Sequence, residues 1–295
     1  MLRAGMGLLG LLTAIAACAA LLALWPIGTP VALGALQPDP QRGAYLARAG
    51  GCIGCHSDPG ADRPALTGGG PIKTSFGSFV APNITPDPDH GIGGWTLEDF
   101  ARAVRQGIAP DGRPYYPAFP YAFYGALSDQ DIVDMWAAFQ TVPASPETAG
   151  AHDIAFPFDL RFGLKLWRAA YLHAPPTAPD PARPEAWNRG QWLVNGLAHC
   201  GACHTDRNLA GGRIAARHLK GSDDLPGGGT APDITATALA RTGWTAGDLA
   251  FALQSGVMPG GDTFGGGMGK VVQHSTAWLT PEDRTAIAQY LTTEN

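Results

Sequence analysis

The feature that most constrains this chain is the run Cys52-Ile53-Gly54-Cys55-His56, which returns as Cys200-Gly201-Ala202-Cys203-His204. A Cys-x-x-Cys-His run is the attachment signal of c-type haem. Each thiol adds to a vinyl group of the porphyrin, and the histidine that follows donates a nitrogen to the iron. We therefore expect two covalently bound haems c. The attachment residues would be Cys52, Cys55, Cys200 and Cys203, and the iron ligands His56 and His204.

The cysteine count argues against other uses of the two pairs. The chain has 5 cysteines, and the fifth, Cys18, lies in the N-terminal apolar run, so no further pair is left for a structural disulfide. A zinc site built from both pairs would leave the two histidines unexplained. A thioredoxin-like redox pair is expected near a βαβ pattern, which this sequence does not show. Haem attachment is the interpretation that uses all of these residues.

Length and composition suit two small domains. The chain has 295 residues, of which 45% are apolar and only 15% are charged. The 40 glycines and 26 prolines are typical of loop-rich domains that wrap around a prosthetic group. The net charge of -5 gives no reason to expect nucleic acid as a partner.

Residues 4–27 form an apolar run of about 24 residues without a charge, which is long enough to cross a bilayer as a helix. We therefore expect residues 1–28 to be a membrane anchor or signal, with a retained transmembrane helix as the first choice. Arg3 would stay in the cytoplasm, which places the haem domains on the periplasmic side of the bacterial inner membrane. The alternatives are a signal peptide cleaved near Cys18 and a lipoprotein lipidated at Cys18. All three imply export.

The rest of the chain contains an internal repeat with an offset of about 150 residues. Ala81-Pro82-Asn83-Ile84-Thr85 matches Ala231-Pro232-Asp233-Ile234-Thr235, and Gly94-Trp95-Thr96 matches Gly243-Trp244-Thr245. An offset that changes by only a few residues over a whole domain indicates duplication. We expect c-type cytochrome domains over residues 38–145 and 187–295. The linker between them, residues 146–186, would contain a short helix over residues 159–172 and a proline-rich end.

Helix signals recur at matched positions in both copies. Polar N-cap residues with an acidic residue three positions later predict helix starts at Thr96, Ser128, Thr245 and Thr280. Gly107 and Gly256 are expected to end the helices that begin at Thr96 and Thr245. No stretch is rich in strand-forming residues. The expected fold class is all-α: two tandem c-type cytochrome domains with an N-terminal transmembrane helix.

A six-coordinate haem iron needs a second axial ligand. For the second haem we expect Met268, because it lies in a glycine-rich loop before the last helix and its soft thioether suits haem iron. Met258 is its rival. In the first copy the matched residue is Phe119, which cannot bind iron. The sixth ligand of the first haem is left open between His90, His152, Met135 and no protein ligand.

Taken together, these residues resemble the cytochrome c subunits of bacterial membrane-associated dehydrogenases that oxidise alcohols, aldehydes, gluconate or fructose, or that belong to the molybdenum hydroxylases. The resemblance covers nearly all of the chain after residue 40. Among the matching runs are Tyr116-Pro117-Ala118-Phe119-Pro120-Tyr121 and Gly267-Met268-Gly269-Lys270-Val271-Val272. The resemblance implies the same attachment cysteines, proximal histidines and distal Met268. Many such subunits carry a third haem domain and some have Met in place of Phe119, so this sequence departs from the pattern twice.

We expect an exported, membrane-anchored dihaem cytochrome that is not itself an enzyme. It would carry electrons from a periplasmic or membrane-associated dehydrogenase to quinone, or to a downstream cytochrome or oxidase of the respiratory chain. The alternative is a dihaem enzyme, either a peroxidase or a thiosulfate-oxidising cytochrome, that uses an open first haem. The neighbours of Phe119 are Pro, Ala and Tyr, without a clear acid–base set, which favours the carrier.

Overall fold

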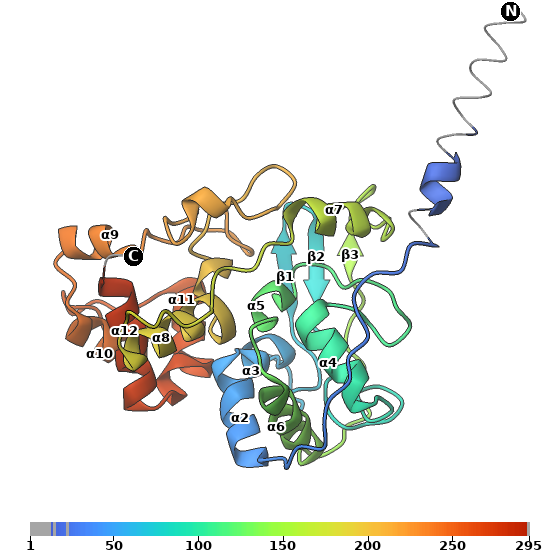
Figure 1. Cartoon of the computed structure of the whole chain (residues 1–295), viewed down its shortest axis with the longest axis horizontal. Coiled ribbons are helices and arrows are strands. Elements are labelled where there is room, and N and C mark those ends of the chain that lie inside the picture. Colours follow the sequence, from blue (N-terminus) through green and yellow to red (C-terminus); the bar gives the residue numbers. More distant parts are fainter. Residues whose placement is uncertain (1–12, 14–15, 22–23, 294–295) are drawn as a thin grey trace, which may run out of the picture.

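The computed structural model describes residue 13, residues 16–21 and residues 24–293 of the chain (Figure 1). Two lobes lie side by side. One is formed by the first half of the chain, in blue to green, and the other by the second half, in yellow to red. Most of the regular structure in the described part is helical, and one small sheet is present.

The two lobes contain matched sets of helices. The helices of the first domain are α2 (Pro40–Ala49), α3 (Cys52–His56), α4 (Leu97–Gln106), α5 (Tyr121–Tyr124) and α6 (Asp129–Gln140). The helix of the connecting segment is α7 (Gly163–Tyr171). The helices of the second domain are α8 (Glu185–Trp192), α9 (Ala236–Arg241), α10 (Ala246–Ser255), α11 (Gly266–His274) and α12 (Pro281–Thr292). Shorter helical turns are η1 (Leu193–Leu197), η2 (Cys200–Ala202), η3 (Ala215–Arg217) and η4 (Thr276–Trp278).

The predicted helix starts are confirmed in both copies. The Thr96 side chain accepts a hydrogen bond from the Asp99 N–H, and the Asp99 carboxylate accepts one from the Thr96 N–H, which completes a capping box at the start of α4. Thr245 begins α10 in the same way. Both helices end at a glycine with positive φ, 62° at Gly107 and 75° at Gly256, as expected for an αL cap. Ser128 and Thr280 cap α6 and α12.

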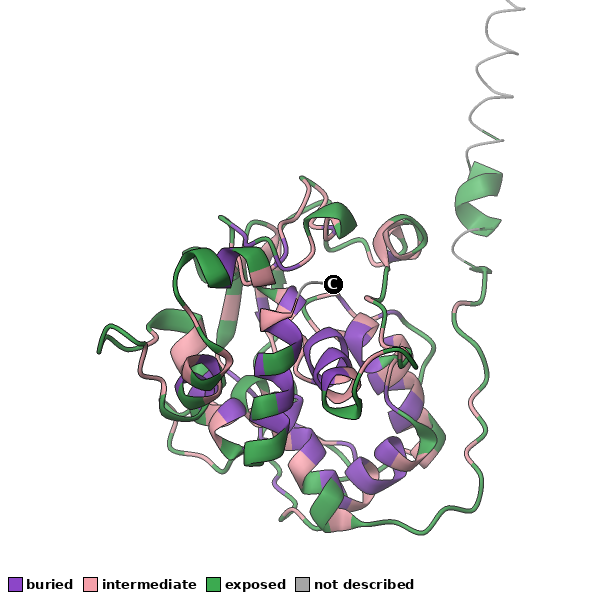
Figure 2. Ribbon diagram, turned by 60° about the vertical axis from the view of Figure 1, so that its left-hand side comes forward, coloured by how far each residue is buried: buried purple, intermediate pink, exposed green. Residues whose placement is uncertain are grey.

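The first and last helices of each domain cross at a glycine. A Cβ on Gly43 of α2 would lie 1.8 Å from the carbonyl oxygen of Asp134 in α6. In the second domain, a Cβ on Gly190 of α8 would lie 2.0 Å from the carbonyl oxygen of Ala286 in α12. Only glycine permits so close a backbone approach. Buried residues gather where these helices face one another (Figure 2). Leu46, Ile132 and Ile287 of these helices are at most 1% exposed and belong to one hydrophobic core.

The prediction of an all-α fold is wrong for one segment. Three antiparallel strands form a sheet in the order β1 (Pro71–Thr74), β2 (Gly77–Val80) and β3 (Asp153–Ile154). β1 and β2 form a hairpin, and Gly77 takes a φ of 128° where the chain leaves the turn. These strands are only two to four residues long, and β1 begins with a proline, so the sequence carries no strand signal there. β3 ties the connecting segment to the first domain.

The prediction of an N-terminal transmembrane helix is also wrong for the part of the chain that the structure describes. No helix among the described residues is long and apolar enough to cross a membrane. The prediction relied on apolar composition, whereas a bilayer span needs about 20 continuous helical residues. The chain leaves helical conformation before Pro26, and residues 26–39 contain no helix. Residues 1–12, 14–15 and 22–23 of the predicted segment lie outside the described residues.

The connecting segment packs less tightly than its sequence suggests. Of the residues in α7, Leu164 is buried, whereas Leu166 is exposed, as is Phe162 just before the helix. Two adjacent residues of the helix instead make polar contacts with the two domains. The Trp167 indole N–H donates to the Ala210 carbonyl 2.7 Å away in the second domain, and Arg168 Nη2 donates to the Gln106 carbonyl 2.7 Å away in the first. α7 therefore bridges the two domains.

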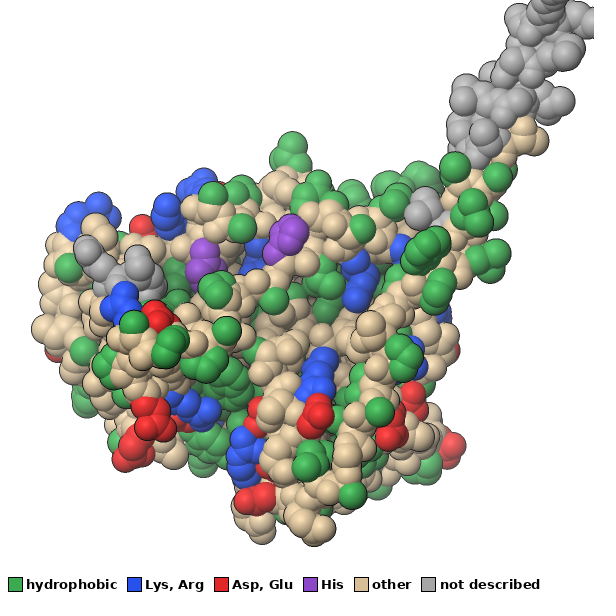
Figure 3. All heavy atoms as spheres, in the orientation of Figure 1, with side chains coloured by type: hydrophobic (Ala, Val, Ile, Leu, Met, Phe, Trp, Pro, Cys, Tyr) green, Lys and Arg blue, Asp and Glu red, His purple; other side chains and the backbone are tan. Residues whose placement is uncertain are grey.

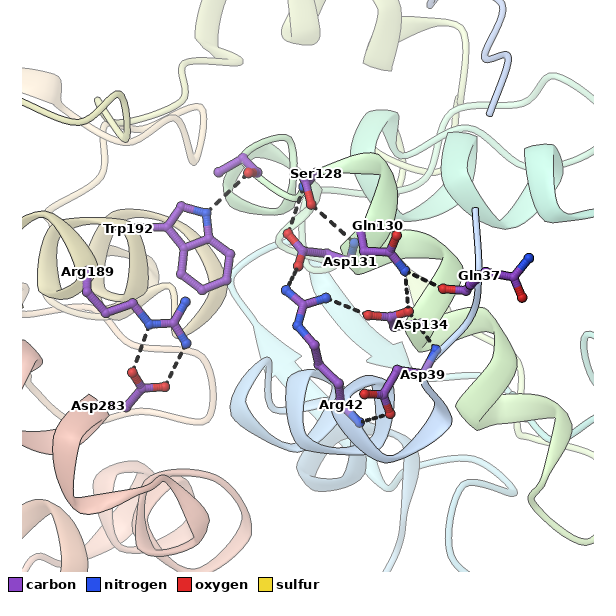
Figure 4. Close-up of polar contacts among 11 residues, drawn as sticks. Gln37, Asp39, Arg42, Ser128, Gln130, Asp131, Asp134, Arg189, Trp192 and Asp283 are labelled. Atoms are coloured by element: carbon purple, nitrogen blue, oxygen red, sulfur yellow. Dashed lines mark hydrogen bonds and ion pairs between the residues drawn. The ribbon is translucent and has the colours of Figure 1, made fainter. Parts of the chain in front are cut away.

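The two domains also meet through matched residues of α2 and α8. Tyr45 and Trp192 occupy the same position in the repeat, and each donates a hydrogen bond across the interface. The Tyr45 hydroxyl donates to the Asp283 carboxylate at 2.5 Å, and the Trp192 indole N–H donates to the Ala126 carbonyl at 3.2 Å. Figure 4 shows Trp192 next to the Arg189–Asp283 ion pair. Each domain therefore donates one hydrogen bond to the other at this contact.

Replacing Asp283 by Asn should weaken both the second domain and the interface. The Asp283 carboxylate accepts two hydrogen bonds from Arg189, at 2.8 and 2.7 Å, as well as the one from Tyr45. Burial alone would raise the pKa of Asp283. The hydrogen bonds from Arg189 and Tyr45 and the Arg189 charge outweigh this effect, so the pKa of Asp283 lies below its ordinary value. We expect the free energy of unfolding to fall by about 2 kcal/mol at pH 7.

The stability difference between Asp283→Asn and wild type should depend on pH. A carboxyl with a depressed pKa stabilises the fold above its unfolded pKa of about 3.9, and this stabilisation is lost as the pH falls through the folded pKa. The difference in urea unfolding between wild type and Asp283→Asn should therefore shrink below about pH 3.9. The exposed neighbour Glu282 supplies the control, because Glu282→Gln should change little. Equal stability of Asp283→Asn and wild type at pH 7 would refute the role of this ion pair.

Candidate haem-binding sites

The first attachment motif (Cys52–His56) forms a short helix of its own, α3. Gly51 precedes it with a φ of 73°, so the chain turns sharply out of α2 and starts α3 at once. Residues three positions apart on a helix share a face, so Cys52 and Cys55 present their thiols to the same side. Both thiols are free. The local fold thus arranges two thiols and an imidazole around one small region.

The second attachment motif (residues 200–204) has a tighter local structure. η2 begins at Cys200, and the residue before it, His199, takes a φ of 42° at the position that Gly51 has in the first copy. Asparagine, aspartate and histidine tolerate this left-handed region better than other non-glycine residues. Cys200 and Cys203 are also free thiols. Both copies therefore have a left-handed residue before the motif, Gly51 in the first and His199 in the second.

Each proximal histidine is oriented by a backbone carbonyl. His56 Nδ1 lies 2.7 Å from the Pro82 carbonyl oxygen, and His204 Nδ1 lies 2.8 Å from that of Pro232. The carbonyl can only accept, so Nδ1 carries the proton and the lone pair of Nε2 is free for a metal. The two prolines belong to the matched segments of the repeat, 26 and 28 residues after their histidines, but the sequence analysis did not assign them this role.

The thiols and imidazoles are held in uncharged form. Burial raises the pKa of Cys52 and Cys200 to about 12. Burial also lowers the pKa of His56 and His204, against an opposing effect of their hydrogen bonds to the proline carbonyls. Neutral imidazole is the form that binds iron. Protonated thiols supply both the sulfur and the hydrogen that an addition to a vinyl group requires.

The two attachment motifs lie close to each other across the domain interface. The pKa of Cys55 is raised by loss of hydration and, in second place, by the nearby Cys203. A Cβ on Gly51 would lie 3.4 Å from the His199 ring, and one on Gly54 would lie 3.4 Å from His274 of α11. Residues of both domains thus border the first motif, and the fold brings together two sites that are about 150 residues apart in sequence.

The predicted distal residues lie at equivalent places in the two domains. Met268 is in the first turn of α11, and Phe119 lies two residues before α5. Both side chains are partly buried against the hydrophobic core. Phe119 is surrounded by aromatic rings, with centroids 6.0 Å away at Tyr115, 6.1 Å at Tyr121 and 5.8 Å at Tyr124. The first domain thus has an aromatic cluster where the second has a thioether.

The three other candidates for the first haem are engaged elsewhere. His90 is exposed and hydrogen-bonds Asp87 at 3.1 Å, in a loop that closes back on Thr85, next to the proximal segment. His152 Nδ1 accepts a hydrogen bond from the Val80 N–H at 3.1 Å, which leaves the proton on Nε2. Met135 is buried in the α2–α6 crossing at 3% exposure, where the second copy has Ile287.

Two buried polar atoms near the aromatic cluster make no hydrogen bond within the described structure. They are the Tyr121 hydroxyl and Arg168 Nη1, and the Arg168 guanidinium lies 4.9 Å from the Tyr121 ring. Buried donors normally have partners. A haem carries propionates, and these two donors are suited to such an anion. Together with the paired thiols and the oriented imidazoles, they make c-type haem a good chemical fit to the residues present.

Two thiols and a carbonyl-oriented histidine on a small helical domain define a c-type cytochrome domain, and this chain has two of them. No family model matches the chain. It is 44% identical over 265 residues to a protein of Cereibacter sphaeroides named "Diheme cytochrome c-type", a match that covers 89% of this chain and 88% of that protein. The chain therefore belongs to the dihaem c-type cytochromes.

Cytochrome subunits of dehydrogenases are also similar to the chain. It is 38% identical over 269 residues to the fructose dehydrogenase cytochrome subunit of Gluconobacter japonicus, and 40% identical over 267 residues to the gluconate 2-dehydrogenase cytochrome c subunit of Pantoea cypripedii. These matches cover 89% and 85% of this chain but only 54% and 58% of the relatives. The chain thus spans about half the length of these subunits, and its relationship is to electron-transfer subunits.

Proposed function

We propose that this dihaem cytochrome accepts electrons from a partner dehydrogenase and delivers them to a quinone or a downstream cytochrome of the respiratory chain, in the periplasm. The observation that carries the proposal is the proximity of the two attachment motifs, because Gly51 lies beside His199, the residue that directly precedes Cys200. When bound, haem supplies one-electron exchange at its iron. Two such groups held close together by one fold suit a relay.

The residues of the chain would tune this relay. His56 and His204 each donate a hydrogen bond from Nδ1–H to a proline carbonyl, which raises the basicity of the nitrogen left for iron. Met268 would raise the reduction potential of the second site, because a thioether favours the reduced metal. The names of the relatives support a dehydrogenase as the electron donor. The surface facing the reader in Figure 3 carries acidic and basic side chains interspersed with many uncharged ones.

The test is reduction by a dehydrogenase. The purified dihaem protein is mixed with the catalytic part of a gluconate or fructose dehydrogenase that lacks its own cytochrome subunit, together with substrate. Growth of the reduced haem band, followed by stopped flow and dependent on substrate, is the expected result. Reduction no faster than that by substrate alone would contradict the proposal for that donor class. Rapid turnover of peroxide with an electron donor would contradict the electron-carrier proposal and favour a dihaem peroxidase.

Replacing Met268 by His should lower the potential of the second haem, because an imidazole stabilises oxidised iron more than a thioether does. The expected shift is on the order of 100 mV, within the range that axial ligands span. Spectroelectrochemical titration measures it. Met258→Leu is the matched control, since Met258 is another partly buried methionine of the same domain. Equal shifts in both variants, or a shift in Met258→Leu alone, would assign the ligand to another residue.

A further inference from the structure

The residues at the two predicted distal positions differ in whether they can bind iron. Met268 offers a sulfur with a lone pair, whereas Phe119 offers only carbon. Both side chains are partly buried: Met268 lies in the first turn of α11, and Phe119 lies two residues before α5. Matched positions of the repeat therefore hold a potential iron ligand in the second domain and a residue that cannot bind iron in the first.

Phe119 is connected to the first attachment motif through Tyr124. The Phe119 and Tyr124 rings are 5.8 Å apart, and the Tyr124 hydroxyl donates to the Gly50 carbonyl at 2.6 Å, just before the motif. Burial raises the pKa of the Tyr124 hydroxyl, and the nearby Cys52 and Cys55 raise it further. The Phe119 ring thus belongs to the surroundings of the first site, and the Tyr124 oxygen already has a hydrogen-bond partner.

The three candidate ligands of the first domain are engaged elsewhere. His90 belongs to the loop that follows Pro82, the residue that orients His56, so it lies with the proximal segment rather than opposite it. Nε2 of His152 carries the proton, because Nδ1 accepts from the Val80 N–H. Met135 sits in the helix crossing. None of these three residues therefore brings a free lone pair to the Phe119 side.

We propose that the Phe119 side of the first haem site is a binding site for small neutral diatomic molecules, of the class of carbon monoxide and nitric oxide, and that the Met268 side of the second site is not. The inference rests on haem attachment at Cys52 and Cys55. The Phe119 ring offers only carbon atoms, and such an apolar surface suits an uncharged diatomic. The proposal is independent of which dehydrogenase donates electrons.

The experiment is a carbon monoxide titration of the reduced, full-length protein, after intact mass has verified two haems. We expect one carbon monoxide bound per chain, and one high-spin and one low-spin signal in the EPR spectrum of the oxidised protein. Phe119→Met should weaken carbon monoxide binding at least tenfold and remove the high-spin signal. Phe119→Leu, which adds no ligand, should keep both properties.

Variants that lack one haem assign the site even if Phe119→Met fails to fold. Carbon monoxide binding should disappear in Cys52→Ala/Cys55→Ala and persist in Cys200→Ala/Cys203→Ala. Two low-spin signals with no carbon monoxide bound would overturn the proposal. It would also be overturned if Cys52→Ala/Cys55→Ala, which lacks the first haem, still bound carbon monoxide and Cys200→Ala/Cys203→Ala did not. Loss of the first haem is visible in the intact mass, so failed attachment is distinguished from a closed distal side.

Discussion

Replacing Cys52 and Cys55 together by alanine should leave a chain with one covalent haem instead of two. Neither thioether can then form, and His56 alone would hold the group only by a reversible bond to iron. Because the haem would fill much of the apolar centre of a small domain, we also expect the first domain to lose native packing. The absorbance of the pyridine haemochrome per chain should fall by about half.

The duplicated fold provides the matched experiment. Cys200→Ala/Cys203→Ala should remove the other haem and leave the first, so both double variants should have equal haem content but different potentials. Cys18→Ala is the control, because Cys18 lies outside both motifs, and its haem content should equal that of wild type. A double variant that retains two covalent haems would show that the motif it lacks is not an attachment site.

Gly43→Ala and Gly190→Ala should be the most disruptive single substitutions in the helical framework. Each new Cβ would lie 1.8 or 2.0 Å from a carbonyl oxygen of the crossing helix, far inside van der Waals contact. The two helices would have to separate, and the core beneath them would lose its packing. Overpacking of this kind costs about 3 kcal/mol, a large part of the stability of a small domain.

Thermal unfolding of the holoprotein and the yield of haem-loaded chain measure this effect. Gly163→Ala is the control, since a Cβ on Gly163 at the start of α7 would meet nothing within 4 Å. In a helix that substitution should stabilise by about 0.5 kcal/mol. If Gly43→Ala and Gly163→Ala unfolded at the same temperature, the close crossing of α2 and α6 would be refuted.

The helices that carry local signals were predictable from the sequence. Thr96 and Thr245 are polar N-caps with a carboxylate three residues later, and both capping boxes form because all their partners are local. The position of the proximal carbonyls was not predictable, although Pro82 and Pro232 stand in an obvious repeat. A carbonyl role depends on where the loop returns in space, and residue type says little about that.

The sheet and the domain contact could not be inferred for a related reason. β3 consists of two residues from the connecting segment, and it forms only because the tertiary fold brings it beside β2. The contact of Tyr45 with Asp283 joins residues from opposite ends of the repeat. At the N-terminus, apolar composition predicted a spanning helix, whereas no described helix is long enough to span. Composition indicates which secondary structure a segment favours, but the length of the segment and its tertiary contacts determine which structure forms.

The most direct test of the central claim, that this chain carries a covalent haem on each motif, is peptide mass mapping after thiol alkylation of the purified native protein. We expect that the peptides with Cys52 and Cys55, and with Cys200 and Cys203, each carry the mass of one haem and no alkyl group. Alkylated, haem-free cysteines at either motif in protein made by a haem-attaching host would contradict it.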